Sequence, residues 1–81
     1  MKVKLQPGCF ECYDEPKRSQ KIKMARDIIS EMSFREIMNC VENQNNMIAV
    51  YDNEHDQHFL FKIRHFNAPD SIVLDWAGSV S

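Results

Sequence analysis

Two stretches of helical periodicity in the middle of the chain do not share one face. Apolar side chains recur at intervals of three and four residues in residues 20–31, and again in residues 34–43. The first stripe consists of Ile22, Ala25, Ile28, Ile29 and Met32, and the second of Phe34, Ile37, Met38 and Val41. At roughly 100° per residue, the second stripe is centred about half a turn around the helix axis from the first. One straight helix would therefore expose apolar surface on two opposite sides.

The residues between the two stripes predict a break. Ser33 and Glu36 have the spacing of a capping box, in which the serine hydroxyl accepts from one backbone amide and the glutamate carboxylate accepts from the other. We therefore expect two short helices, over about residues 20–31 and 34–43, with the first N-capped by Ser19. The alternative is one continuous helix between two apolar layers.

Four other segments have the composition or alternation of strands. We expect strands at residues 1–6, 47–51, 59–66 and 72–76. Pro7-Gly8 should end the first strand, and polar turns separate the other three. Residues 77–81 are predicted to be a frayed, flexible tail.

These elements define a fold class. The 81 residues leave room for a single domain, residues 1–81, with the order β-α-α-β-β-β. Consecutive strands joined by short turns usually pair antiparallel, and the N-terminal strand should join at an edge or in the centre. We predict an α+β domain with an antiparallel sheet of three or four strands and two short helices packed on one face.

The composition indicates which class of protein and which cellular compartment to expect. Apolar residues make up 43% and charged residues 27% of the chain, as in ordinary globular proteins. No apolar run reaches the ~18 residues of a membrane helix, and the N-terminus lacks the apolar core of a signal peptide. Three cysteines are an odd number, which argues against a disulfide framework. We expect a cytoplasmic protein with reduced thiols and no membrane partner.

A CxxC motif is the candidate metal site. Cys9 and Cys12 have the spacing of a zinc knuckle, and His55 and His58 would have to supply the second pair of ligands. The two pairs lie more than forty residues apart, which does not match the common zinc-finger spacings. We therefore favour loop thiols, solvated histidines and no cofactor, and keep a zinc-stabilised domain as an alternative.

A basic cluster occupies the expected start of the first helix. Its members are Lys17, Arg18, Lys21, Lys23 and Arg26. The helix dipole disfavours cations there by about 0.3–1 kcal/mol each when they are exposed. The cluster therefore suggests an anionic partner, either a phosphate group or an acidic protein surface. A solvated basic face is the simpler interpretation.

The strand at residues 59–66 carries aromatic side chains on both of its faces. Under strict alternation, Leu60, Lys62, Arg64 and Phe66 share one face. Its cations could extend the basic surface of the helix, and a surplus aromatic there would mark a protein interface or the seam of a homodimer.

The charge distribution and the absence of catalytic motifs indicate which class of function to expect. Residues 1–41 hold eight Lys or Arg against six Asp or Glu, a net of +2, whereas residues 42–81 hold two against six, a net of −4. Two glycines exclude phosphate-binding and dinucleotide loops, and no nucleophile elbow or HExxH occurs. We predict a small non-catalytic protein-binding module, a regulator or inhibitor that occupies a partner's surface. The alternative is a nucleic-acid-binding module that uses residues 17–26.

Overall fold

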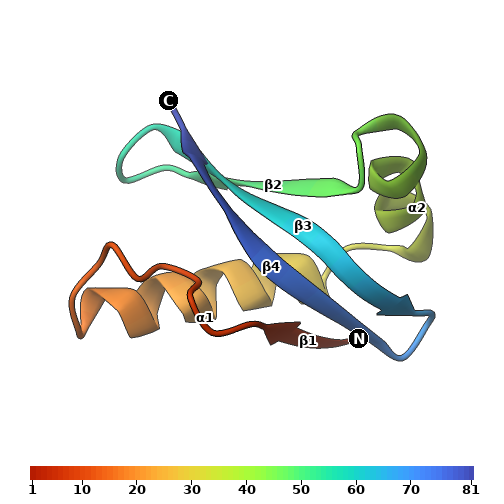
Figure 1. The fold of residues 1–81 in the computed structure, drawn as a ribbon, viewed down its shortest axis with the longest axis horizontal. Coiled ribbons are helices and arrows are strands. Elements are labelled where there is room, and N and C mark those ends of the chain that lie inside the picture. The colour runs from red at the N-terminus through yellow and green to blue at the C-terminus, as the bar shows by residue number, and fades with distance from the viewer.

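The computed structural model describes residues 1–81 and confirms the expected order of elements (Figure 1). The elements are β1 (Lys2–Leu5), α1 (Lys17–Ser30), α2 (Phe34–Asn43), β2 (Met47–Asp52), β3 (Gln57–Asn67) and β4 (Ser71–Val80). The protein is a small α+β domain with one curled four-stranded sheet. In the view of Figure 1, α1 passes behind the sheet and α2 lies beside the start of β2. Neither α1 nor α2 has the length and apolar run that crossing a membrane requires.

The break between the helices is made by the predicted capping box. The Glu36 amide donates to the Ser33 hydroxyl at 3.1 Å, and the Ser33 amide donates to the Glu36 carboxylate at 3.0 Å. The start of α1 differs from the prediction, since the helix begins at Lys17 and Ser19 lies inside its first turn. Both the amide and the hydroxyl of Ser19 donate to the Glu15 carboxylate at 2.8 Å, so an acidic side chain before the helix satisfies the donors there.

The sheet is mixed, which corrects the expectation of a purely antiparallel sheet. The strand order is β1-β4-β3-β2, with β1 parallel to β4 and the other pairs antiparallel. Short turns fix the relative direction of consecutive strands only. The partner of β1 is the last strand of the chain, so two helices and a hairpin intervene and either direction can be reached.

A bulge in β3 overturns the predicted face of Phe66. Ile63 pairs with Leu74 and His65 pairs with Val73, so Arg64 is an extra residue on the β3 side. An extra residue shifts every later side chain to the other face. Phe66 therefore points to the helix side, where it packs against the core, and does not share a face with Leu60, Lys62 and Arg64.

The end of β4 differs from the predicted flexible tail. Residues 77–80 continue the strand, with Gly78 opposite Leu60 and Val80 opposite His58. Ala77 is an extra residue on the β4 side, and Gly78 adopts a φ of +110°, a conformation that favours glycine. With this local bulge, β4 continues to pair as far as His58, at the start of β3.

The core lies between the helices and the sheet and includes two side chains from the N-terminal loop, Cys9 and Phe10. Phe10 is completely buried, with its ring centroid 4.8 Å from that of Phe59 and 4.7 Å from that of Trp76. Cys9 and Cys12 were expected to be loop thiols, and the burial of Phe10 between them was not predicted. The opposite face of the sheet is covered by no helix or strand of the chain.

Replacing Ser33 with Ala should lower the free energy of unfolding by about 1 kcal/mol, because the Glu36 amide loses its acceptor. Urea denaturation measures the change. Ser30→Ala is the matched control, since that hydroxyl donates only to the Asp27 carbonyl within α1. We expect the control to stay within about 0.5 kcal/mol of the parent protein. Equal losses in both variants would contradict a specific role for the capping box.

Candidate binding surface

One cation of the predicted basic cluster points into the molecule. Lys21 lies on α1 and is only 4% exposed, and Asp52 at the end of β2 is equally buried. The Lys21 ammonium donates to Asp52 Oδ2 at 2.9 Å and lies 5.7 Å from the ring centroids of Tyr13 and Phe59. Lys21 is therefore a contact between α1 and the β2–β3 hairpin, and it offers no charge to a partner.

Other polar groups lie within hydrogen-bonding distance of this buried ion pair. Asp52 Oδ2 also accepts from Gln57 Nε2 at 3.2 Å and lies 3.1 Å from His55 Nδ1, while the Lys21 ammonium reaches Glu54 at 3.3 Å. Burial acts to raise the pKa of Asp52, but the hydrogen bonds from Lys21, Gln57 and His55 outweigh it and hold that pKa at about 2. Burial likewise acts to lower the pKa of Lys21, and its bonds to the two carboxylates raise it.

The predicted zinc ligands are not brought together. No three of Cys9, Cys12, His55 and His58 share a site, and the group of metal-ligand type that does form is Asp52, Glu54 and His55. The Lys21 ammonium already lies among those three side chains, 2.9–3.4 Å from each. Cys9 is buried, and burial followed by the charge of Asp75 raises the pKa of its thiol, which disfavours the thiolate that binds zinc.

The remaining cations of α1 divide between two environments. Lys17 is exposed, and Lys23 forms an exposed ion pair with Asp27 at 2.7 Å. Arg18 and Arg26 instead line a hollow of about 410 Å³ between α1, β1 and the loop that follows β1. Lys4 of β1 lines the same hollow.

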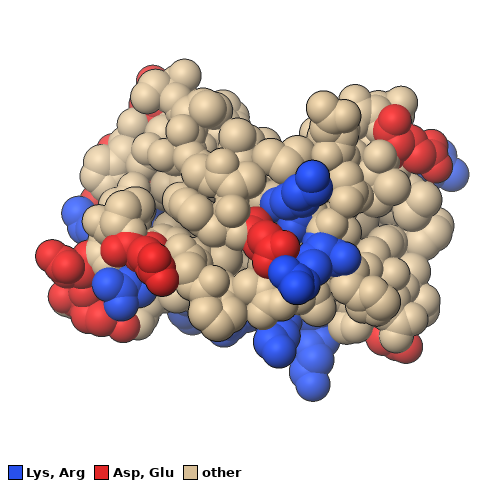
Figure 2. Space-filling view, viewed as in Figure 1, with Lys and Arg blue, Asp and Glu red and all other residues tan.

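The uncovered face of the sheet gathers a second group of cations. Lys62 and Arg64 of β3 point to this face, as predicted, and Arg64 lies 3.3 Å from Asp75 of β4. Lys2 and Lys4 of β1 point to the same side, since they alternate with the buried Val3 and pair with Ser71 and Val73. Figure 2 shows Lys and Arg atoms grouped at the middle of this face around one acidic side chain.

We call Lys2, Lys4, Lys62 and Arg64 the basic face. Lys4 also lines the hollow with Arg18 and Arg26, so the basic face continues around the β1 edge onto α1. Sequence reasoning found the cations of α1 and β3 but missed Lys2 and Lys4. Their alternation with apolar residues was the available signal, because it places both lysines opposite the buried side of the first strand.

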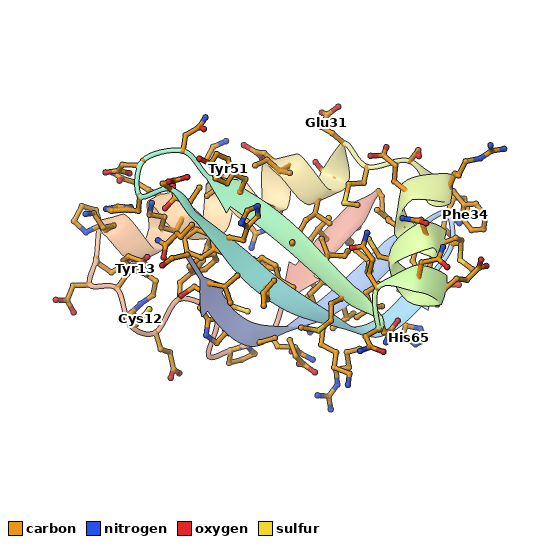
Figure 3. All side chains as sticks on the ribbon, turned by 90° about the horizontal axis from the view of Figure 1, so that it is seen from above. Cys12, Tyr13, Glu31, Phe34, Tyr51 and His65 are labelled. Atoms are coloured by element: carbon orange, nitrogen blue, oxygen red, sulfur yellow. The ribbon has the colours of Figure 1, made fainter.

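Leu60 and Phe66, the last two residues of the predicted partner-binding surface, lie on different faces of the sheet. Leu60 is half-buried on the uncovered face, opposite Ala49 and Gly78. Phe66 lines a different, apolar hollow of about 220 Å³ on the helix side, with Met1, Met32 and Pro69 among its neighbours. Its ring lies 6.0 Å from that of Phe34, which is 57% exposed at the end of the molecule that α2 occupies (Figure 3).

The fold and these surfaces define a small α+β domain with one sheet face uncovered. No family model, no curated protein and no solved structure matches the chain.

Replacing Lys21 with Met should lower the free energy of unfolding by roughly 3 kcal/mol, because Asp52 then stays buried without its partner. Lys23→Met is the control on the same helix. It breaks an exposed ion pair and should cost less than about 0.5 kcal/mol. Denaturation midpoints of the two variants test this difference, and similar losses would contradict the role assigned to Lys21.

Acid should weaken the folded state through the same pair. The pKa of Asp52 falls from an ordinary 3.8 to about 2 on folding, so its stabilisation is complete above about pH 4 and is lost as the pH falls toward 2. The expected loss is about 1–2 kcal/mol. Unfolding free energies measured between about pH 7 and pH 2 should show it, and the slope should flatten in Lys21→Met. An unchanged slope in that variant would contradict the assignment.

Proposed function

We propose that the protein is a non-catalytic protein-binding module whose basic face docks onto an acidic surface of a partner protein. In this role it acts as a regulator or inhibitor by occupying that surface. The observation that carries the proposal is the arrival of cations from β1 and β3, two strands far apart in sequence, on one uncovered sheet face.

The basic face is a local feature of an acidic molecule. The net charge is −2, yet four cations share this face with Asp75. Acidic residues concentrate instead in the loops at residues 11–15 and 52–56. Such a separation orients an approaching partner and raises the rate of productive encounter.

The surroundings of the basic face have the composition of a protein interface. Half-buried or small apolar side chains lie on the same side of the sheet, namely Leu60, Val73, Ala49 and Met47. Apolar surface beside Arg is common in protein interfaces, where an apolar centre is enclosed by a polar rim. An uncovered sheet face of this kind can bury area against another protein without rearrangement.

Several features favour protein over nucleic acid. Lys21 and Lys23 of the predicted nucleic-acid site are engaged by Asp52 and Asp27. No Phe, Tyr or Trp lies next to the cations of the basic face, where bases could stack. Tyr51 lies on the same side of the sheet but opposite His58, four positions along β2 from Met47, the neighbour of Lys62. Asp75 beside Arg64 would also repel a phosphate.

The double variant Lys62→Glu/Arg64→Glu should reduce partner capture about tenfold or more, because it reverses two charges at the centre of the basic face. Tagged protein is incubated with extract of its native cells at about 50 mM salt, and the retained molecules are quantified by mass spectrometry. Lys17→Glu/Lys23→Glu is the matched control, because it makes the same change in net charge on α1, behind the sheet.

The results of this experiment distinguish binding to a protein from binding to a nucleic acid. A nuclease-resistant protein partner with an acidic surface, lost in the sheet variant and kept in the α1 variant, supports the proposal. Capture that nuclease abolishes would establish nucleic-acid binding instead. Equal retention by both variants, or no capture by the parent protein, would contradict a partner site on the basic face.

A further inference from the structure

The two edge strands of the sheet differ in how well they are protected against pairing with another strand. β1 has only four residues, exposes Lys2 and Lys4, and leads directly into Gln6-Pro7. Short length, lysines and a nearby proline are the devices by which proteins block pairing at a sheet edge. β2, at the opposite edge, has six residues and lacks Lys, Pro and bulges. Its sequence from Met47 to Tyr51 is rich in residues that favour strands.

The backbone of β2 presents hydrogen-bonding groups along this open edge. The Ile63 amide donates to the Asn46 carbonyl at 2.9 Å, which fixes the alternation of the ladder with β3. Residues 48 and 50 therefore bond to β3, whereas the amides and carbonyls of Ala49 and Tyr51 point away from it. The Met47 amide also points outward but donates to the Gln44 carbonyl at 3.1 Å. Figure 3 looks down on this edge and shows no helix or strand lying over β2.

We propose that β2 pairs with β2 of a second copy of this chain. Antiparallel pairing about a two-fold axis at Val50 places Ala49 opposite Tyr51 of the other copy, twice. Each such pair exchanges two backbone hydrogen bonds, so the outward amides of both residues find acceptors. The two four-stranded sheets then form one continuous sheet of eight strands.

The side chains of this edge fit their own symmetry copy. On the uncovered face, Tyr51 is 45% exposed and would lie beside Ala49, a small exposed residue, of the other chain. Residues directly opposite on paired strands lie close enough for their side chains to make contact. Residues 47–51 carry no charge, and Asp52 is already paired with Lys21, so no like charges meet across the axis.

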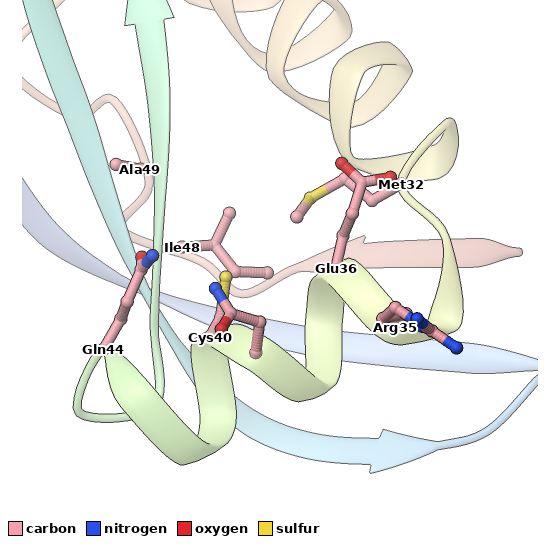
Figure 4. Close-up of a pocket in the computed structure, with 8 residues that line it drawn as sticks. Met32, Arg35, Glu36, Cys40, Gln44, Ile48 and Ala49 are labelled. Carbon is pink, nitrogen blue, oxygen red and sulfur yellow. The ribbon is translucent and has the colours of Figure 1, made fainter.

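The helix side of the edge leaves room for the added strand. A hollow of about 500 Å³ lies beside α2 and β2, lined by Met32, Cys40 and Ile48 among others (Figure 4). Glu36 and Arg35 of α2 border this hollow and carry opposite charges. Because Ala49 of the β2 edge also lines this hollow, the space next to that edge is not filled by α2.

The dimer would also double the basic face. A two-fold axis perpendicular to the sheet places both uncovered faces on the same side, so a partner with two acidic patches would bind with avidity. The pairing of β2 itself does not depend on the proposed function. Its test uses purified protein alone, so the two proposals can fail separately.

Oligomeric state tests the pairing directly. Analytical ultracentrifugation at about 10–200 µM protein should show a dimer for the parent chain. Ala49→Pro removes an outward amide that β3 does not use, and Tyr51→Lys places two lysines beside the axis; both should give monomers. Ala77→Lys, an exposed substitution on the interior strand β4, should remain dimeric. A parent monomer, or a dimer that survives both edge substitutions, would overturn the proposal.

Amide hydrogen exchange gives a second measurement that does not depend on a variant folding. The amides of Ala49 and Tyr51 should exchange slowly at high protein concentration and at least tenfold faster on dilution to monomer. Those of Ile48 and Val50 bond to β3 in either state and should change little. Fast exchange at Ala49 and Tyr51 at every concentration would show that the edge is unpaired and overturn the proposal.

Discussion

The ion pair between Lys21 and Asp52 sets the position of α1 against the sheet. It joins the middle of the first helix to the point where β2 turns toward β3, and both side chains are almost inaccessible to water. Burying one charge alone would cost several kcal/mol, so each group restricts where the other element can lie. Tyr13 and Phe59 flank the ammonium, which ties the N-terminal loop and β3 to the same point.

The bulge at Arg64 determines which side chains of β3 lie on each face of the sheet. Before it, Phe59, Phe61 and Ile63 face the helices, and after it Phe66 does too. Unbroken alternation would have placed an aromatic ring among the cations of the uncovered face. The single extra residue instead keeps all the aromatic side chains of this strand on the helix side. The opposite side is left for Leu60, Lys62 and Arg64.

Local signals in the sequence predicted the elements, whereas the contacts between distant residues decided the rest. The capping box could be predicted because Ser33 and Glu36, three residues apart, satisfy each other's amides. The parallel pairing of β1 with β4 and the bulge at Arg64 could not be, since both depend on a partner strand elsewhere in the chain. The same holds for Lys21, whose burial is determined by Asp52, thirty-one residues away.

A sheet covered on one face by helices leaves three surfaces open, namely its other face and its two edges. In this protein the three differ in charge and in free backbone groups. The β1 edge is short and carries lysines, which prevents further pairing. The uncovered face carries Lys2, Lys4, Lys62 and Arg64, and charged side chains favour contact with water. Only the β2 edge combines free backbone donors with uncharged side chains, and such an edge is a template for pairing with another strand. In the proposed dimer the two-fold axis keeps both charged faces on one side, so pairing at β2 would enlarge the basic face without covering it.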